Sequence, residues 1–185
     1  MSCTLAARPL ARVGVLVTVA ALSGCASSVA RAPTSFPYSS TAGRFSVVFP
    51  SKPDTGVREA TDNGAKRRVT SALAKKGSDD FGVTWSDFPT DFLAAGNAAV
   101  LERVRDKVVG DVKATLVSSD EITLAGHPGL AVKAKVASGA TKGDYRVRFY
   151  LVKNRIYEVL VIRNAVSSDE SVVLDFFDSF QFTGS

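Results

Sequence analysis

The side chains that most often perform chemistry are scarce in this sequence. His127 is the only histidine, and the two cysteines are Cys3 and Cys25. A Ser/His/Asp triad would have to use His127, which lies in a Gly-His-Pro-Gly segment typical of a turn. No Gly-x-Ser-x-Gly nucleophile elbow, phosphate-binding glycine loop or EF-hand spacing is present. We therefore expect His127 to have a structural role.

A metal centre is not expected either. Zinc takes three or four clustered histidine, cysteine or carboxylate ligands, and this chain has almost no imidazole or thiol to supply. Three pairs of adjacent acidic residues have ordinary explanations, in a turn, in a strand and at a helix start, where negative charge is favourable. These pairs are Asp79-Asp80, Asp120-Glu121 and Asp169-Glu170. A hydrolase built only from carboxylates stays open, but we predict no enzyme activity, no metal and no cofactor.

One cluster of basic residues has two interpretations. Its members, in two neighbouring predicted strands, are Lys133, Lys135, Arg146 and Arg148. The two-residue period of a strand places all four on one sheet face, close to Tyr150. They form either a solvated face answered by Glu158 and helix carboxylates, or an anion-binding patch for lipid headgroups, acidic glycans or an acidic protein. Like charges opposite one another need a negative partner in both cases.

The N-terminal segment has the three parts of a secretory signal in order. Two arginines precede an apolar run at 13–22, which Leu-Ser-Gly-Cys at 22–25 closes. The run is too short to span a membrane, which takes about 20 apolar residues. Residues 22–25 resemble the lipobox of bacterial lipoproteins, in which the cysteine is lipidated before cleavage. We predict a lipoprotein signal peptide at 1–24 and lipidation of Cys25; the alternative is an ordinary signal peptide that contains a cysteine by chance.

Lipidation would anchor the protein and remove its thiol chemistry. After cleavage Cys25 is the only cysteine, so that no disulfide can form. Two acyl chains, such as a palmitate pair, give stable membrane binding, since each buried methylene contributes about 0.8 kcal/mol. Ala26 follows the cysteine. A residue other than Asp there implies the periplasmic face of an outer membrane in a Gram-negative cell, and otherwise we expect the outer face of the cytoplasmic membrane.

A short tether is expected to precede a single domain. Residues 26–42 are rich in serine and proline, so we predict a flexible tether at 25–42 with a reach of roughly 20–25 Å. The rest, 43–185, is long enough for one domain with its own core. The net charge is +5, or +3 without the two arginines of the signal. This charge is well short of that of a nucleic-acid-binding protein.

Hydrophobic periodicity predicts an α+β domain. Strands are predicted at 45–50, 66–76, 81–88, 115–124, 130–137, 144–152 and 155–163, and helices at 97–113 and after a capping box formed by Ser167 and Glu170. Turns at 77–80, 126–129, 138–143 and 153–154 make neighbouring strands antiparallel. We therefore expect an antiparallel sheet of about six to seven strands covered by two helices.

Four segments of this domain resemble the PsbP/Mog1-like superfamily. They are Gly43–Pro50, Ile122–Gly129, Arg148–Val161 and Phe176–Phe180. The resemblance spans about 43–182 and implies an α/β/α sandwich. Members include extrinsic photosystem subunits, a Ran-binding protein and many bacterial lipoproteins, and they act mainly by binding other proteins. The family has no catalytic motif to carry over.

These observations predict a membrane-anchored cell-envelope lipoprotein that acts as a non-enzymatic protein-interaction module, with a protein partner and no nucleic acid. The alternative is a binder of a lipid or another apolar small molecule. Such a binder needs a cavity between sheet and helices, which would be lined by Phe81, Trp85, Phe176 and Phe177. We expect these four aromatic residues to form a closed core instead, because aromatic side chains are usually buried in cores.

Overall fold

The computed structural model describes residues 35–62, 65–137, 142–164 and 169–184. The predicted signal peptide at 1–24 and the predicted lipidation of Cys25 lie outside these residues. The described strands and helices belong to one compact unit, Pro33–Ser185.

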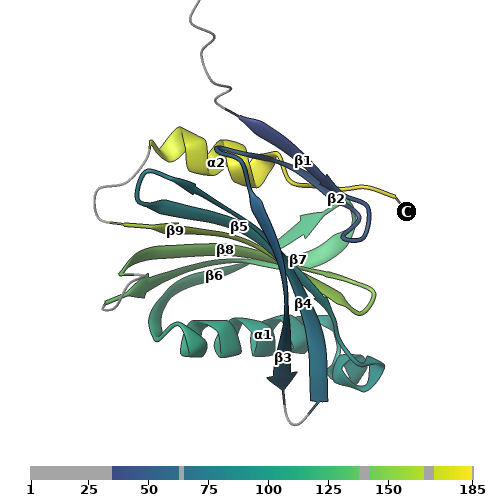
Figure 1. Ribbon diagram of the computed structural model, residues 1–185. Coiled ribbons are helices and arrows are strands. Elements are labelled where there is room, and N and C mark those ends of the chain that lie inside the picture. The colour runs from purple at the N-terminus through teal and green to yellow at the C-terminus, as the bar shows by residue number, and fades with distance from the viewer. Residues whose placement is uncertain (1–34, 63–64, 138–141, 165–168, 185) are drawn as a thin grey trace, which may run out of the picture. The chain divides into compact units, whose positions relative to one another are not determined.

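A seven-stranded antiparallel sheet forms the centre of the domain (Figure 1). In spatial order its strands are β3 (Asp54–Asp62), β4 (Ala65–Lys76), β5 (Asp79–Asp87), β9 (Arg155–Arg163), β8 (Gly143–Val152), β7 (His127–Val136) and β6 (Ala114–Leu124). Each neighbouring pair is antiparallel. The predicted antiparallel sheet is therefore confirmed, and β5 and β9 lie side by side near its middle although they are far apart in sequence.

One face of this sheet is covered by aromatic packing. The cover consists of α2 (Glu170–Asp178) and a small sheet of β1 (Phe36–Ser40), β2 (Phe45–Phe49) and β10 (Gln181–Phe182). Phe45 is fully buried, and its ring centroid lies 5.1 Å from that of Trp85 on β5 and 5.4 Å from that of Phe180. The alternation of Phe81, Val83 and Trp85 supplies the facing surface of β5.

The opposite face of the sheet carries η1 (Thr90–Ala95) and α1 (Asn97–Asp111). Figure 1 shows α1 and α2 on opposite sides of the sheet. Val100, Leu101 and Val104 of α1 are buried against β7, β8 and β9. The helix predicted at 97–113 is thus confirmed, and the two predicted helices cover different faces.

Arg155 connects the small sheet to the central one. Its Nε and Nη2 donate to the two carboxylate oxygens of Asp87, at 2.6 and 2.8 Å, while Nη1 donates to the Ala42 carbonyl at 2.6 Å. The Tyr157 hydroxyl donates to the Gly43 carbonyl at 2.7 Å. These bonds fix the β1–β2 turn over the β5–β9 pair, and the hydrogen bond from Arg155 holds the pKa of Asp87 below its ordinary value.

The tether predicted at 25–42 is wrong at its C-terminal end. Residues Phe36–Ser40 form β1, which pairs with β2, and Tyr38 lies opposite Val47. The serines and proline of this segment hid the alternation of Phe36 and Tyr38, which are partly buried against the aromatic core. Strand β3 was also missed, because it is a polar edge strand with only Val57 as a large apolar residue.

Three predicted boundaries are also corrected. The turn at 77–80 is shorter, since Asp79 is buried in β5. His127 begins β7 instead of lying in the turn, which is made by Ala125 and Gly126 with positive φ angles of 50° and 81°. The N-cap of α2 is Asp169, whose carboxylate accepts from the Ser171 N–H at 3.1 Å, whereas Ser167 lies outside the described residues.

The shared aromatic core predicts that Phe45 is important for stability. Phe45→Ala is expected to lower the free energy of unfolding by about 3–5 kcal/mol, because it leaves a cavity between the two sheets. Val48→Ala on the same strand, where the side chain is 36 % exposed, should cost about 0.5 kcal/mol or less. Urea denaturation measures both values. A Phe45→Ala variant as stable as Val48→Ala would contradict a common core.

Candidate functional site

The structure separates the predicted basic cluster into two parts. Lys133 lies directly opposite Arg146 in the β7–β8 ladder, but Lys135 lies opposite Asp144. Arg146 pairs with Glu170 of α2, and so does Arg163 of β9. Arg148 donates to Asp178 at the other end of the same helix, at 3.0 Å. The arginines thus pair with the carboxylates of α2, as the interpretation of the cluster as a solvated face predicted.

One predicted partner of this cluster is wrong. Glu158 lies opposite Thr84 and Phe149 in the ladders, on the sheet face that α1 covers, and the arginines lie on the other face. Tyr150 does lie on the arginine face, where its ring stacks on Phe180 with centroids 5.8 Å apart. The side chains of Lys133 and Lys135 are exposed. Anion binding by these two lysines stays a prediction.

The four aromatic residues proposed to line a cavity are packed together. Phe81, Trp85, Phe176 and Phe177 are at most 6 % exposed, and the rings of Phe81 and Phe176 meet edge to face at 5.3 Å. The prediction of a closed core is therefore confirmed for these residues. His127 packs edge-on against Phe182 at 5.2 Å, an arrangement that agrees with a structural role.

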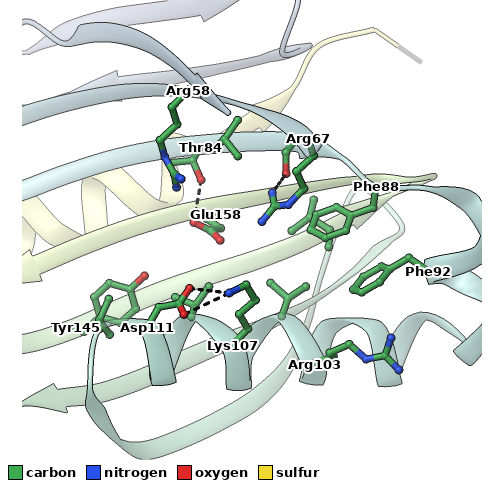
Figure 2. Close-up of a pocket in the computed structure, with 16 residues that line it drawn as sticks. Arg58, Arg67, Thr84, Phe88, Phe92, Arg103, Lys107, Asp111, Tyr145 and Glu158 are labelled. Carbon is green, nitrogen blue, oxygen red and sulfur yellow. Dashed lines mark hydrogen bonds and ion pairs between the residues drawn. The ribbon is translucent and has the colours of Figure 1, made fainter. Parts of the chain in front are cut away.

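A pocket of about 330 Å³ opens on the other face of the sheet, between α1 and the strands (Figure 2). Its floor comes from β5, β8 and β9. Strands β3 and β4 form one wall, α1 forms the opposite wall, and η1 closes one end with Phe92. In Figure 2, Arg58 and Arg67 descend from the strand side, and Lys107 and Asp111 rise from the helix side.

The floor of the pocket is polar. The Thr84 hydroxyl donates to Oε2 of Glu158 at 2.9 Å, and the largely buried Tyr145 lies beside them. Burial raises the pKa of the Glu158 carboxyl, and the Thr84 hydrogen bond and the nearby charges of Arg67 and Arg58 offset part of this effect. The floor therefore holds a carboxyl group whose pKa is above its ordinary value.

The helix wall of the pocket is apolar. Val104 and Val108 of α1 and Val112, the C-cap residue of this helix, follow one another at a spacing of four residues and form a valine stripe on one face. Ile156 and Val69 contribute from the sheet. A molecule in the pocket would thus meet hydrocarbon on its sides and polar groups on the floor.

Two arginines are held by aromatic rings at one end of the pocket. The Arg67 guanidinium carbon lies 4.4 Å from the Phe88 ring centroid, and Nη1 donates to Ser86 Oγ at 2.5 Å. Arg103 lies 5.2 Å from the Phe92 centroid. The two rings stack on each other at 4.6 Å. Cation–π contact of this kind restricts the orientation of the guanidinium plane.

Sequence reasoning missed this pocket because its residues come from distant segments. One signal was available: Thr84, Ser86 and Glu158 are polar residues on the α1 face of strands otherwise rich in apolar residues. A second signal is that Arg103 and Lys107 flank the valine stripe of α1 at a spacing of four residues.

Within the described residues, no group of three or more His, Cys, Asp or Glu side chains is placed to hold a metal ion. Neither described helix is long and apolar enough to cross a membrane.

The raised pKa of Glu158 leads us to expect that the stability difference between the native protein and Glu158→Gln depends on pH. The folded-state pKa of this carboxyl is raised, so the stability that its neutral form provides is present below its ordinary pKa of 4.5 and is lost as the pH rises through the folded-state value. Glu158→Gln cannot ionise and should become more stable than the native protein as the pH rises.

Thermal denaturation between about pH 4 and pH 8 checks this prediction. Glu102→Gln, at an exposed position of α1, controls for the loss of a carboxylate. A native-minus-Glu158→Gln stability difference that does not change with pH would contradict a raised pKa of the Glu158 carboxyl.

Comparison with known proteins identifies the fold. No protein-family model matches the chain, and no curated protein sequence matches it. Among solved structures, the solution structure of cyanobacterial PsbP (CyanoP) from Synechocystis sp. PCC 6803 is similar, with a TM-score of 0.52 and 15 % sequence identity. The match covers 83 % of this chain and 95 % of CyanoP. The chain therefore has a PsbP-like α+β fold, as its sequence pattern predicted.

Proposed function

We propose that this protein is a non-enzymatic binding protein of the cell envelope, held at a membrane by lipid on Cys25, with the pocket beneath α1 as its binding site. The pocket is the observation that carries the proposal. Its volume of about 330 Å³ falls in the range of small-molecule sites, which combine apolar walls with a few placed polar groups. This function corresponds to the alternative of a small-molecule binder. The site lies beneath α1, however, and not among the four aromatic residues named for it in the sequence.

The contacts within the pocket support binding in preference to catalysis. The Arg67 guanidinium rests on Phe88 and bonds to Ser86, and the Glu158 carboxyl accepts from Thr84. These contacts orient the polar groups of a pocket whose helix wall is apolar. The lone histidine, the commonest general base, lies against Phe182 and does not line this pocket.

A protein-interaction role is the second candidate, and the β6 edge favours it. β6 is one of the two outer strands of the seven-stranded sheet, and its ladder with β7 shifts register between Leu116 and Ser118. Leu116 and Val117 at this irregularity are 42 % and 57 % exposed. An outer strand offers unpaired backbone groups to which an extended partner segment can add.

Filling the pocket tests the first candidate. Val108→Trp places an indole on the pocket side of α1, and Val117→Trp adds the same group at the exposed β6 edge. We expect members of a small-molecule fragment library to shift NMR resonances of α1 and β9 in the native protein and in Val117→Trp, but not in Val108→Trp. Fragments that bind Val108→Trp as well as the native protein would contradict the pocket as the binding site.

The same pair of variants discriminates the second candidate. A protein partner that crosslinks to the native protein and to Val108→Trp, but not to Val117→Trp, would assign the interaction to the β6 edge.

The anchor requires its own test. We expect the native protein to fractionate with membranes and Cys25→Ser to appear in the soluble fraction, since acyl chains provide the membrane affinity. Fractionation of cell extracts followed by mass measurement of the N-terminal peptide checks both distribution and lipid. Identical distribution of the two forms would contradict the proposed anchor.

A further inference from the structure

The charges around the pocket beneath α1 are unbalanced. Four basic side chains line it, from Arg58, Arg67, Arg103 and Lys107, against the two carboxyl groups of Asp111 and Glu158. Lys107 pairs with Asp111, its Nζ lying 3.1 Å from Oδ2. Glu158 accepts a hydrogen bond from Thr84. Even with both carboxyl groups ionised, the side chains that line the pocket therefore carry more positive than negative charge.

The arginines are arranged to recognise an oxyanion. Arg58 and Arg67 come from the neighbouring strands β3 and β4 and point into the gap above the floor (Figure 2). Stacking on Phe88 and the bond to Ser86 fix the orientation of Arg67. A guanidinium held in one orientation brings positive charge and N–H donors to a fixed place, which suits the oxygens of a carboxylate or a phosphate.

The rest of the pocket suits a hydrocarbon group. The valine stripe of α1 faces Ile156 and Val69 across the cavity, and the Phe88–Phe92 stack closes one end. Burying apolar surface against these side chains contributes roughly 25 cal/mol per Å². A small inorganic anion would use only the arginines and leave this apolar wall exposed to water.

We propose that the pocket binds an amphiphilic oxyanion, a small molecule with a carboxylate or phosphate head against Arg58 and Arg67 and an apolar body against the valine stripe of α1. This inference rests on the binding function proposed above and names its ligand class. A cationic amphiphile fits less well, because both carboxyl groups of the pocket already have partners in the structure.

Calorimetric titration of the full-length protein tests the ligand class. The probes are octanoate, octyl phosphate, octan-1-ol and inorganic phosphate. We expect octanoate or octyl phosphate to bind at least about tenfold more tightly than either octan-1-ol or inorganic phosphate, because only the amphiphiles use both parts of the site. If octanoate binds more tightly than octyl phosphate, the natural head group is a carboxylate; the reverse order indicates a phosphate. Increasing the salt concentration should weaken the binding of either compound.

Matched variants locate the head. Arg58→Gln and Arg67→Gln should each lower the affinity for the amphiphile by about tenfold, because each removes one charge-assisted hydrogen bond. Lys135→Gln, at an exposed lysine on the opposite sheet face, should leave the affinity unchanged. Arg58 is itself exposed on the edge strand, so its variant keeps the test valid if Arg67→Gln fails to fold.

The outcomes separate the ligand class from the pocket itself. If octan-1-ol binds as tightly as octanoate and Arg58→Gln weakens neither, the oxyanion proposal is overturned while the pocket remains the binding site. If Val108→Trp binds octanoate as tightly as the native protein, both the ligand class and the proposed site are wrong.

Discussion

The central β5–β9 pair has one apolar face, which other apolar side chains have to cover. On this face the rings of Trp85 and Tyr157 pack against those of Phe45 and Phe180, and the ring of Phe81 packs against that of Phe176. The bonds from Arg155 to Asp87 and Ala42 keep this cover in place. Every other part of the domain depends on this closed aromatic face, because it fixes the sheet on which the second face, with its pocket, is built.

The second face is covered less completely. Valines of α1 are small, and the strand residues facing Val108 and Val112 include the polar Thr84 and Glu158. On this face, short valine side chains lie above polar side chains and leave a space between them. On the opposite face, aromatic rings fill the corresponding space. The difference between the two covers thus accounts for the position of the pocket, for its apolar helix wall and for its polar floor.

Six of the seven central strands, all but the polar edge strand β3, and both helices could be predicted from sequence because their periodicity is strong and local. Strand β1 could not, since serine and proline interrupt a pattern that only pairing with β2 reveals. The four basic residues were correctly predicted to share one sheet face. The assignment of Glu158 to that face was wrong, because the alternation of side chains along a strand fixes a face only once the pairing register with the neighbouring strands is known. The pocket joins Arg58, Phe92 and Lys107, which no local pattern connects.

The claim that the pocket beneath α1 is a ligand site can be tested on material from its own cells. The measurement is mass spectrometry of small molecules released from the full-length protein purified from native membranes, beside the Val108→Trp variant. The account predicts one anionic amphiphile in near-equal ratio to the native protein and its loss from Val108→Trp. The same molecules released in equal amounts from both proteins would contradict it.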